Sequence, residues 1–183
     1  MPLFEELGVH SRIVVTGPQR SGTRIATRII ANDTGHRFVD ELEFGVRDEE
    51  RWREVLRDER IVVQAPCMLK ESVDNPPSGV FIVLMRRDLI KIHASEHRTG
   101  WDQWPDGNAL ELGKFGLTDG DSAQTKYDYW ASHKKLAPFL ELEYESLRPH
   151  PLFIPDDQRR NFKLLQTTLS VTFHRGVWVD RRA

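Results

Sequence analysis

Four short apolar runs, rich in β-branched residues, most constrain what this chain can fold into. They lie at 12–17 (RIVVTG), 60–66 (RIVVQAP), 80–86 (VFIVLMR) and 138–144 (PFLELEY). Continuous apolar runs of this length, bounded by Gly or Pro, are typical of strands that are covered on both faces of a sheet. Because segments with helical spacing separate them, the pattern predicts an α/β fold, with three layers (α/β/α) around a central, mainly parallel sheet.

The segments between the runs predict helices at 21–33, 47–59 and 88–98. A further helix is expected to start at Asp121 or Ser122 and to continue to about Leu136, with Tyr127, Trp130 and Leu136 on its buried side. A helix near 156–169 and an edge strand in the tail complete the expected elements. The segment 99–122 is rich in Gly and Asp without a clean period, so we predict a lid or acceptor loop there.

Length and composition bound the class of protein. The 183 residues fit one domain, 1–183. With 26 basic against 28 acidic side chains, the formal net charge is −2, which indicates no general attraction to nucleic acid or to anionic membrane. No apolar run approaches the ~20 residues needed to cross a bilayer, and the N-terminus does not resemble a secretory signal. A single cysteine, Cys67, excludes an internal disulfide, so we expect a cytoplasmic protein.

The first apolar run leads directly into a helix through the stretch GPQRSGTR, Gly17 to Arg24. Its two glycines are spaced as in the phosphate loop G-x-x-x-x-G-K-[ST], but Thr23 and Arg24 replace the lysine and the magnesium-binding hydroxyl. A strand that turns through glycines into a helix presents backbone N–H groups and the positive end of a helix dipole, which suit phosphate or sulfate. Here Arg20 and Arg24 would add the charge, because guanidinium groups bind oxyanions in bidentate fashion.

The stretch PQRSGTR resembles the 5′-phosphosulfate loop of the sulfotransferases that use 3′-phosphoadenosine 5′-phosphosulfate (PAPS). Common forms of that loop are P-K-S-G-T-T and R-S-G-T-T, and the heparan sulfate 3-O-sulfotransferases have K-G-G-T-R. The resemblance implies a P-loop-like sulfotransferase fold in which PAPS is the cosubstrate and no metal takes part. The residues that would hold its 5′-phosphosulfate are Gly17, Arg20, Ser21, Gly22, Thr23 and Arg24.

A second motif, VFIVLMRRDLIKIHAS, resembles the 3′-phosphate motif R-[ND]-P-x-x-x-x-x-S of the same families. Arg87 and Ser95 are eight residues apart, and Leu89 stands in place of the proline. An arginine at the carboxyl end of a strand and a serine two helical turns further along can meet around one phosphate. We therefore expect Arg87 and Ser95 to bind the 3′-phosphate.

The stretch FVDELEFG, 38–45, resembles the E-[VI]-x-F-F segment of the heparan sulfate 3-O-sulfotransferases and N-sulfotransferases, whose first glutamate is the general base. The resemblance assigns that role to Glu41, and a carboxylate can accept the proton that an acceptor hydroxyl loses. His93 is the runner-up base. Arg20 is assigned a catalytic role as well, neutralising charge on the bridging oxygen of PAPS.

One departure from the family pattern lies in RIVVQAP. It aligns loosely with the strand-end K-[ST]-P of these enzymes, but Gln64 stands where they have a lysine, and Lys70 is a candidate substitute.

The sequence is therefore interpreted as a metal-independent sulfotransferase that moves a sulfuryl group from PAPS to an unidentified hydroxyl or amine acceptor. Trp101, Trp104 and Phe115 in the lid are candidates to stack on that acceptor. Two alternatives stay open. One is a Mg²⁺-dependent small nucleotide kinase or triphosphatase, for which Asp88 is the one carboxylate at a strand end. The other is a non-catalytic nucleotide-binding module, which the loss of the lysine at Gln64 favours.

Overall fold

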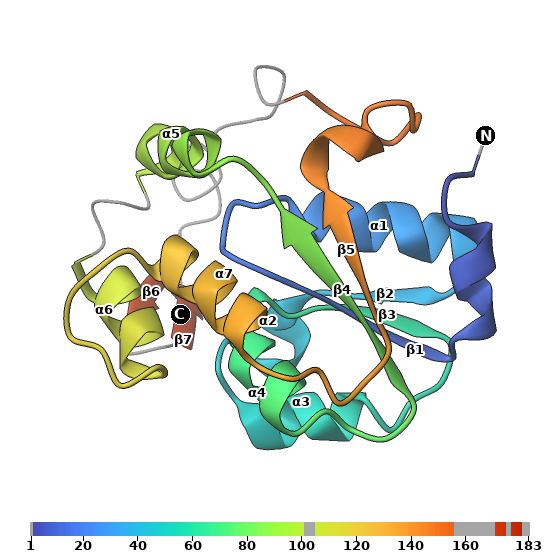
Figure 1. The fold of residues 1–183 in the computed structure, drawn as a ribbon, viewed down its shortest axis with the longest axis horizontal. Coiled ribbons are helices and arrows are strands. Elements are labelled where there is room, and N and C mark those ends of the chain that lie inside the picture. The colour runs from blue at the N-terminus through green and yellow to red at the C-terminus, as the bar shows by residue number, and fades with distance from the viewer. Residues whose placement is uncertain (1, 101–104, 156–170, 175–176, 181–183) are drawn as a thin grey trace.

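A five-stranded sheet forms the centre of the structure, a computed structural model that describes residues 2–100, 105–155, 171–174 and 177–180. The strands are β1 (Arg12–Thr16), β2 (Arg37–Val39), β3 (Ile61–Gln64), β4 (Val80–Arg86) and β5 (Phe139–Glu143), in the spatial order β2-β3-β1-β4-β5. Every neighbouring pair is parallel. Helices cover both faces (Figure 1), so the predicted three-layer α/β fold is confirmed.

The two faces of the sheet carry separate apolar clusters, because successive side chains of a strand point to opposite sides. Ile13 and Val15 of β1 pack toward α1 (Thr23–Thr34) and the 3-10 helices η1 (Glu5–Val9) and η4 (Tyr144–Leu147). Val14 packs on the other side with α3 (Glu49–Val55), α4 (Leu69–Asp74) and α7 (Ser122–Ser132). All three of these β1 side chains are fully buried.

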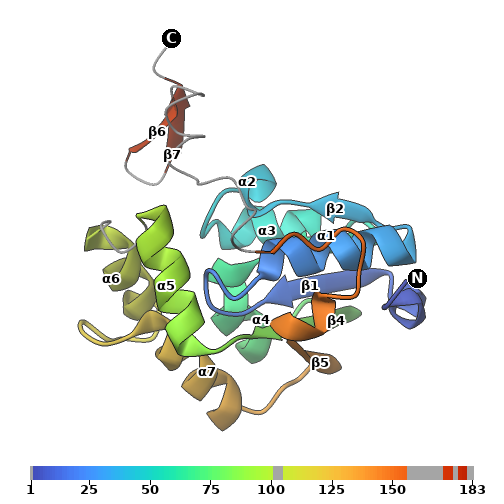
Figure 2. The same cartoon turned by 90° about the horizontal axis from the view of Figure 1, so that it is seen from above.

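The segments that follow the strands gather at the carboxyl end of the sheet. They include α2 (Glu41–Phe44) after β2, η2 (Pro66–Met68) after β3, and α5 (Leu89–Thr99) after β4. Figure 2 shows α5 and α6 (Pro105–Gly113) beyond the end at which β1 finishes. This is the edge at which open α/β sheets bind their ligands.

Aspartates fix where several of these helices begin. Asp40, Asp48, Asp88 and Asp121 are the N-caps of α2, α3, α5 and α7, and each accepts a hydrogen bond from a backbone N–H of its own helix. Such caps satisfy N–H groups that have no partner within the helix. Asp121 is one of the two caps that the sequence predicts for α7.

Several sequence-based expectations need correction. The segment 99–122 contains a helix, α6, whose Glu111 and Leu112 are buried. Helix α7 ends at Ser132, so Leu136 lies beyond it and is 62% exposed. The tail forms β6 (Val171–His174) and β7 (Val177–Asp180), which pair antiparallel with each other and add no edge to the central sheet. The helix expected near 156–169 lies outside the described residues.

Candidate functional site

The turn from β1 into α1 is tightly constrained. Gly17, Arg20 and Gly22 have φ angles of 134°, 65° and 101°, of which the glycines adopt theirs without strain. A Cβ on Gly17 would lie 2.8 Å from the carbonyl oxygen of Met85, and one on Gly22 would lie 2.4 Å from Cδ2 of Tyr144. The turn therefore has room for glycine alone at both positions.

The turn is closed by its own hydrogen bonds, and no side chain caps the helix that follows it. Ser21 Oγ donates to Pro18 O at 2.7 Å, and the Ser21 N–H donates to the same oxygen at 3.2 Å, which closes the turn. The N-cap of α1 is Gly22, which provides no side-chain cap for the first N–H groups of the helix. Thr23 at the helix start is buried. A helix end of this kind is suited to phosphate or sulfate.

The second predicted motif converges on the first. Arg87 Nη1 donates to the carbonyl oxygen of Arg20 at 2.9 Å, and Arg20 Nε donates to Ser95 Oγ at 3.2 Å. Arg87 and Ser95 are both buried, with 6% and 3% exposure. Two stretches that lie about seventy residues apart in the chain therefore share one hydrogen-bonded unit at the carboxyl end of the sheet.

Arg87 is held by aromatic residues on two sides. Tyr127 of α7 accepts a hydrogen bond from the Arg87 backbone N–H, with 2.9 Å between N and OH. The guanidinium carbon of Arg87 lies 4.1 Å from the ring centroid of Tyr144, a distance typical of a cation–π contact. Tyr144 is also the residue that restricts Gly22. These contacts fix Arg87 relative to the glycine turn.

A cavity of about 530 Å³ adjoins this unit, between α5 and the segment that follows β5. Four basic side chains line it, together with two aromatic rings and one carboxylate: Arg87, Lys91, Arg98, Arg148, Tyr144, Phe153 and Glu145. Lys91 and Glu145 pair with each other at 2.6 Å. A second cavity, of about 310 Å³, lies near His10, Gly79 and Pro138, at the starts of the strands and away from these charges.

Glu41, the predicted base, lies near this end of the sheet in the first turn of α2. Gln64 Nε2 donates to its Oε1 at 3.3 Å, and the Cys67 thiol lies 3.8 Å from its Oε2. Burial raises the pKa of Glu41 to about 7, with the negative charge of Asp40 acting in the same direction. Gln64, which replaces the lysine of the family pattern, thus contacts the predicted base directly.

Arg24 forms an ion pair within the protein, and its expected contact with a 5′-phosphosulfate stays a prediction. Its guanidinium pairs with Asp40 at 2.8 Å, and its side chain is half-exposed. Arg20, by contrast, lies within the unit formed by Arg87 and Ser95. The structure therefore brings one of the two loop arginines to the second motif and pairs the other with the cap of α2.

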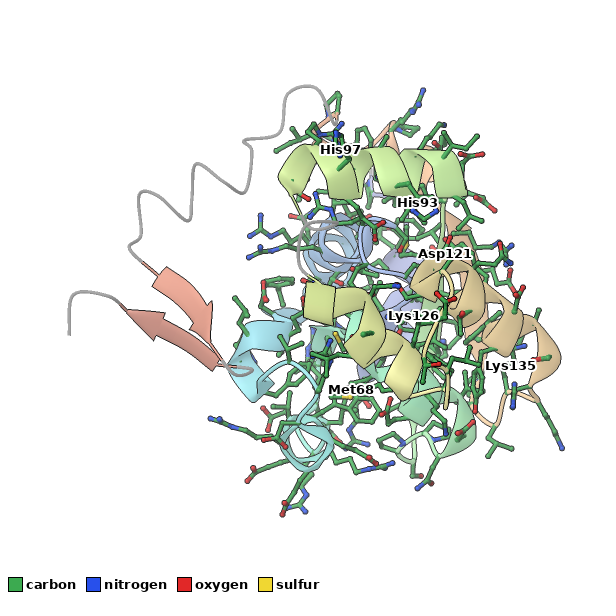
Figure 3. The ribbon with its side chains drawn as sticks, turned by 90° about the vertical axis from the view of Figure 1, so that its left-hand side faces the viewer. Met68, His93, His97, Asp121, Lys126 and Lys135 are labelled. Atoms are coloured by element: carbon green, nitrogen blue, oxygen red, sulfur yellow. The ribbon has the colours of Figure 1, made fainter. Side chains whose placement is uncertain are left out.

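His93 does not contact the glycine turn. Its two ring nitrogens lie 3.1 Å from a carboxylate oxygen of Glu96 and 2.9 Å from one of Asp121 (Figure 3). The hydrogen bond with Glu96 and the charge of Asp121 raise the pKa of His93. His93 therefore links α5 to the cap of α7.

A buried lysine that sequence reasoning missed lies beneath the turn. Lys126 of α7 is 1% exposed, and its Nζ contacts Gln19 Oε1 at 2.7 Å, Pro66 O at 2.9 Å and Glu111 Oε2 at 2.6 Å. The sequence carried a signal for it, because Lys126 is four residues before Trp130 and therefore lies on the face predicted to be buried.

Lys70, the candidate substitute for the missing lysine, lies elsewhere. Its Nζ pairs with Asp74 at 2.6 Å within α4, and it also lies 5.7 Å from the ring centroid of Tyr129. Two other lysines contact the segment after β3: Lys126 through Pro66 O and Lys114 through Cys67 O.

The segment predicted as a lid also contacts the segment after β3. Lys114, which follows α6, donates to the carbonyl oxygen of Cys67 and pairs with Glu71 at 3.1 Å. Phe115 packs against the core and stacks edge-on with Tyr129, with 5.0 Å between ring centroids. Trp101 and Trp104 lie outside the described residues.

Comparisons with known proteins add no family assignment, because no family model and no curated protein matches the chain. None of the helices in the described part of the chain has the length and apolar character that a bilayer crossing requires. Within the same residues, no three His, Cys, Asp or Glu side chains are grouped as ligands for a metal ion.

Proposed function

We propose that this protein is a PAPS-dependent sulfotransferase that moves a sulfuryl group to a hydroxyl or amine acceptor. The observation that carries the proposal is the convergence of the two anion-binding motifs. Arg87 donates to the backbone of Arg20, and Arg20 donates to Ser95, so the glycine turn and the Arg87–Ser95 pair form one unit. A nucleotide with phosphate groups at both its 3′ and 5′ positions has anionic ends for both parts of such a unit.

The residues of the site fit PAPS as a substrate. Gly17 and Gly22 let the turn pack closely against Met85 and Tyr144, and the helix that begins there presents backbone N–H groups, which suit a phosphate. The basic cavity beside Arg87 offers further cations, Arg98 and Arg148, to a 3′-phosphate. Positive charge from arginine suits this role because guanidinium groups hold phosphate oxygens in bidentate fashion.

The proposed reaction is an in-line sulfuryl transfer. The acceptor oxygen or nitrogen forms a bond to sulfur while the bond between sulfur and the bridging oxygen breaks. The electron pair of that broken bond stays on adenosine 3′,5′-bisphosphate, where Arg20 neutralises the growing charge. The acceptor proton passes to Glu41, whose pKa of about 7 suits a base that works near neutral pH. Preorganised charge of this kind supplies much of the rate enhancement in enzymes.

Two other functions are less well supported. A kinase or triphosphatase would need a carboxylate for Mg²⁺ near the loop, and the side chain of Asp88 is engaged as the N-cap of α5 through the Lys91 N–H. A non-catalytic nucleotide-binding module remains the stronger alternative, because Gln64 brings no positive charge to the end of β3.

Calorimetry separates these functions. We expect adenosine 3′,5′-bisphosphate to bind in the presence of EDTA, and ATP to bind at least about tenfold more weakly with or without Mg²⁺. Arg87→Ala should weaken bisphosphate binding by about 10- to 100-fold, because a charge-assisted hydrogen bond contributes about 1.5–3 kcal/mol. Arg86→Ala is the matched control, since Arg86 pairs with Glu141 and Glu143 of β5.

Preference for Mg²⁺·ATP would contradict the proposal and favour the kinase. Turnover separates the enzyme from the module, since release of bisphosphate from PAPS must rise when pooled hydroxyl and amine acceptors are added. Tight binding of the bisphosphate without any such release would identify a binding module.

A further inference from the structure

The buried ammonium of Lys126 connects three segments around the proposed site. Its acceptors come from the turn after β1 (Gln19), from the segment after β3 (Pro66) and from α6 (Glu111). Figure 3, which views this side of the molecule, labels Lys126 where α7 adjoins α6. Two of its three N–H donors are used in hydrogen bonds to Gln19 and Pro66, and the ammonium forms an ion pair with Glu111. Because Lys126 is only 1% exposed, it acts through the groups that it holds.

Lys126 belongs to a cluster in which two basic side chains pair with one buried carboxylate. Arg47 also contacts Glu111, with 3.1 Å between Nη2 and Oε1, and Glu111 is 2% exposed. Although burial raises the pKa of Glu111, Lys126 and Arg47 together lower it to about 2. Glu111 is therefore a carboxylate at neutral pH, and two basic side chains, Lys126 and Arg47, pair with it.

Glu41 lies within the influence of this cluster. The charged or titratable groups that face it are Asp40 on its own helix cap, Arg24 of α1, Cys67 of η2, Glu111 of α6 and Lys126 of α7. The two cations favour the carboxylate form of Glu41, whereas Asp40 and Glu111 disfavour it. The uncharged Gln64 donates one hydrogen bond to Glu41 without adding charge.

We propose that Lys126 is a positioning residue of the site. It fixes Gln19 in the glycine turn, and through Pro66 it holds the segment whose Cys67 lies against Glu41. The inference rests on the function proposed above, because it assumes that the turn binds an anion and that Glu41 accepts a proton. A purely structural role is a weaker account. Burying an ion pair brings little net stability compared with apolar side chains of similar size, whereas both partners of Lys126 outside α6 lie in segments of the site.

Titration of Glu41 tests whether Lys126 acts on the surroundings of the proposed base, without relying on turnover. The measurement is carbon-detected NMR of the side-chain carboxyl of Glu41 in the full chain, as a function of pH. Lys126→Met should raise the titration midpoint above its value of about 7, by about one pH unit. Glu111→Gln should lower it, because the negative charge that opposes ionisation is lost. Lys134→Met, at an exposed lysine beyond the end of α7, is the control and should change nothing.

Binding of adenosine 3′,5′-bisphosphate tests the positioning of Gln19. Gln19→Ala removes the link between the turn and Lys126 but keeps the charge of Lys126. We expect it to weaken binding by about tenfold while the midpoint of Glu41 stays unchanged. This variant and Glu111→Gln keep the inference testable even if Lys126→Met fails to fold.

Three results would overturn the inference. The first is a titration midpoint of Glu41 that does not change in Glu111→Gln. The second is a midpoint that shifts in the same direction in Glu111→Gln and in Lys126→Met. The third is unchanged binding of adenosine 3′,5′-bisphosphate in Gln19→Ala. Failure of the proposed function looks different. In that case the unmodified protein does not bind the bisphosphate at all, while the titration of Glu41 still responds to the two charge changes.

Discussion

Glu41→Gln should make the protein more stable at alkaline pH while it removes the proposed base. The folded state raises the pKa of Glu41 from 4.5 to about 7. Between these two values the folded state binds more protons than the unfolded state, so Glu41 makes the free energy of unfolding fall as pH rises. Glutamine has nearly the same shape and no charge, and it can still accept the hydrogen bond from Gln64.

The size of the effect follows from the same two pKa values. Each unit of pKa difference corresponds to about 1.36 kcal/mol, so the full cost of the ionised carboxylate above pH 7 is up to about 3 kcal/mol. For a chain of this length, that free energy corresponds to an increase in Tm of roughly 6–12 °C at pH 8. At pH 4.5 and below, where Glu41 is protonated in the folded state, the difference should nearly vanish.

Thermal unfolding followed by circular dichroism at pH 4.5 and pH 8 measures the effect. Glu54→Gln is the control, because Glu54 is an exposed glutamate in the neighbouring helix α3. Transfer to acceptor should fall by about 10²–10⁴ in Glu41→Gln if Glu41 is the base. A Tm difference that is the same at both pH values, or a loss of stability at pH 8, would refute the reasoning.

Two further predictions concern the turn and the helix cap. Gly22→Ala should lower the free energy of unfolding by about 2–4 kcal/mol in urea titrations, because the new Cβ would overlap Tyr144 and the residue has a φ of 101°. Gly116→Ala is the control for backbone strain alone, since Gly116 has a φ of 74° and no atom within 4 Å, and it should lower the free energy of unfolding by about 1 kcal/mol. Equal losses in the two variants would count against the overlap. The folded-state pKa of His93 is raised, so the stability it contributes is present below pH 6.5 and is lost as pH rises through the folded value. His93→Gln should therefore lower the free energy of unfolding by less than about 1 kcal/mol at pH 5.5, because the side chain is partly exposed, and should leave it unchanged at pH 9. A larger decrease at pH 9 than at pH 5.5 would contradict this.

The fold class could be predicted because the strongest strands are buried on both faces. The run VFIVLMR at 80–86 matches β4 residue for residue, since a central strand must be apolar throughout. Strand β2, three residues long at the edge of the sheet, and the short helices α2 and α4 leave no such pattern. Helix α6 was not predicted within 99–122 because Gly and Asp residues there are more typical of loops. Its place in the fold depends on contacts of Glu111 with Arg47 and Lys126.

The candidate site was predictable where it depends on local chain geometry. The glycine turn and the eight-residue spacing of Arg87 and Ser95 are readable in the sequence, because a strand followed by a helix fixes both. The partners of Arg24 and Lys126 are not readable in this way. Asp40 and Gln19 meet them only after β2, α1 and α7 have packed together, and no spacing along the chain specifies those contacts.

A crystal structure of the protein soaked with adenosine 3′,5′-bisphosphate in EDTA tests the central claim most directly. We predict that its 3′-phosphate will contact the Arg87 guanidinium and Ser95 Oγ, while its 5′-phosphate will accept hydrogen bonds from backbone N–H groups between Arg20 and Arg24. A ligand whose phosphates leave either of these two places unfilled would contradict the account.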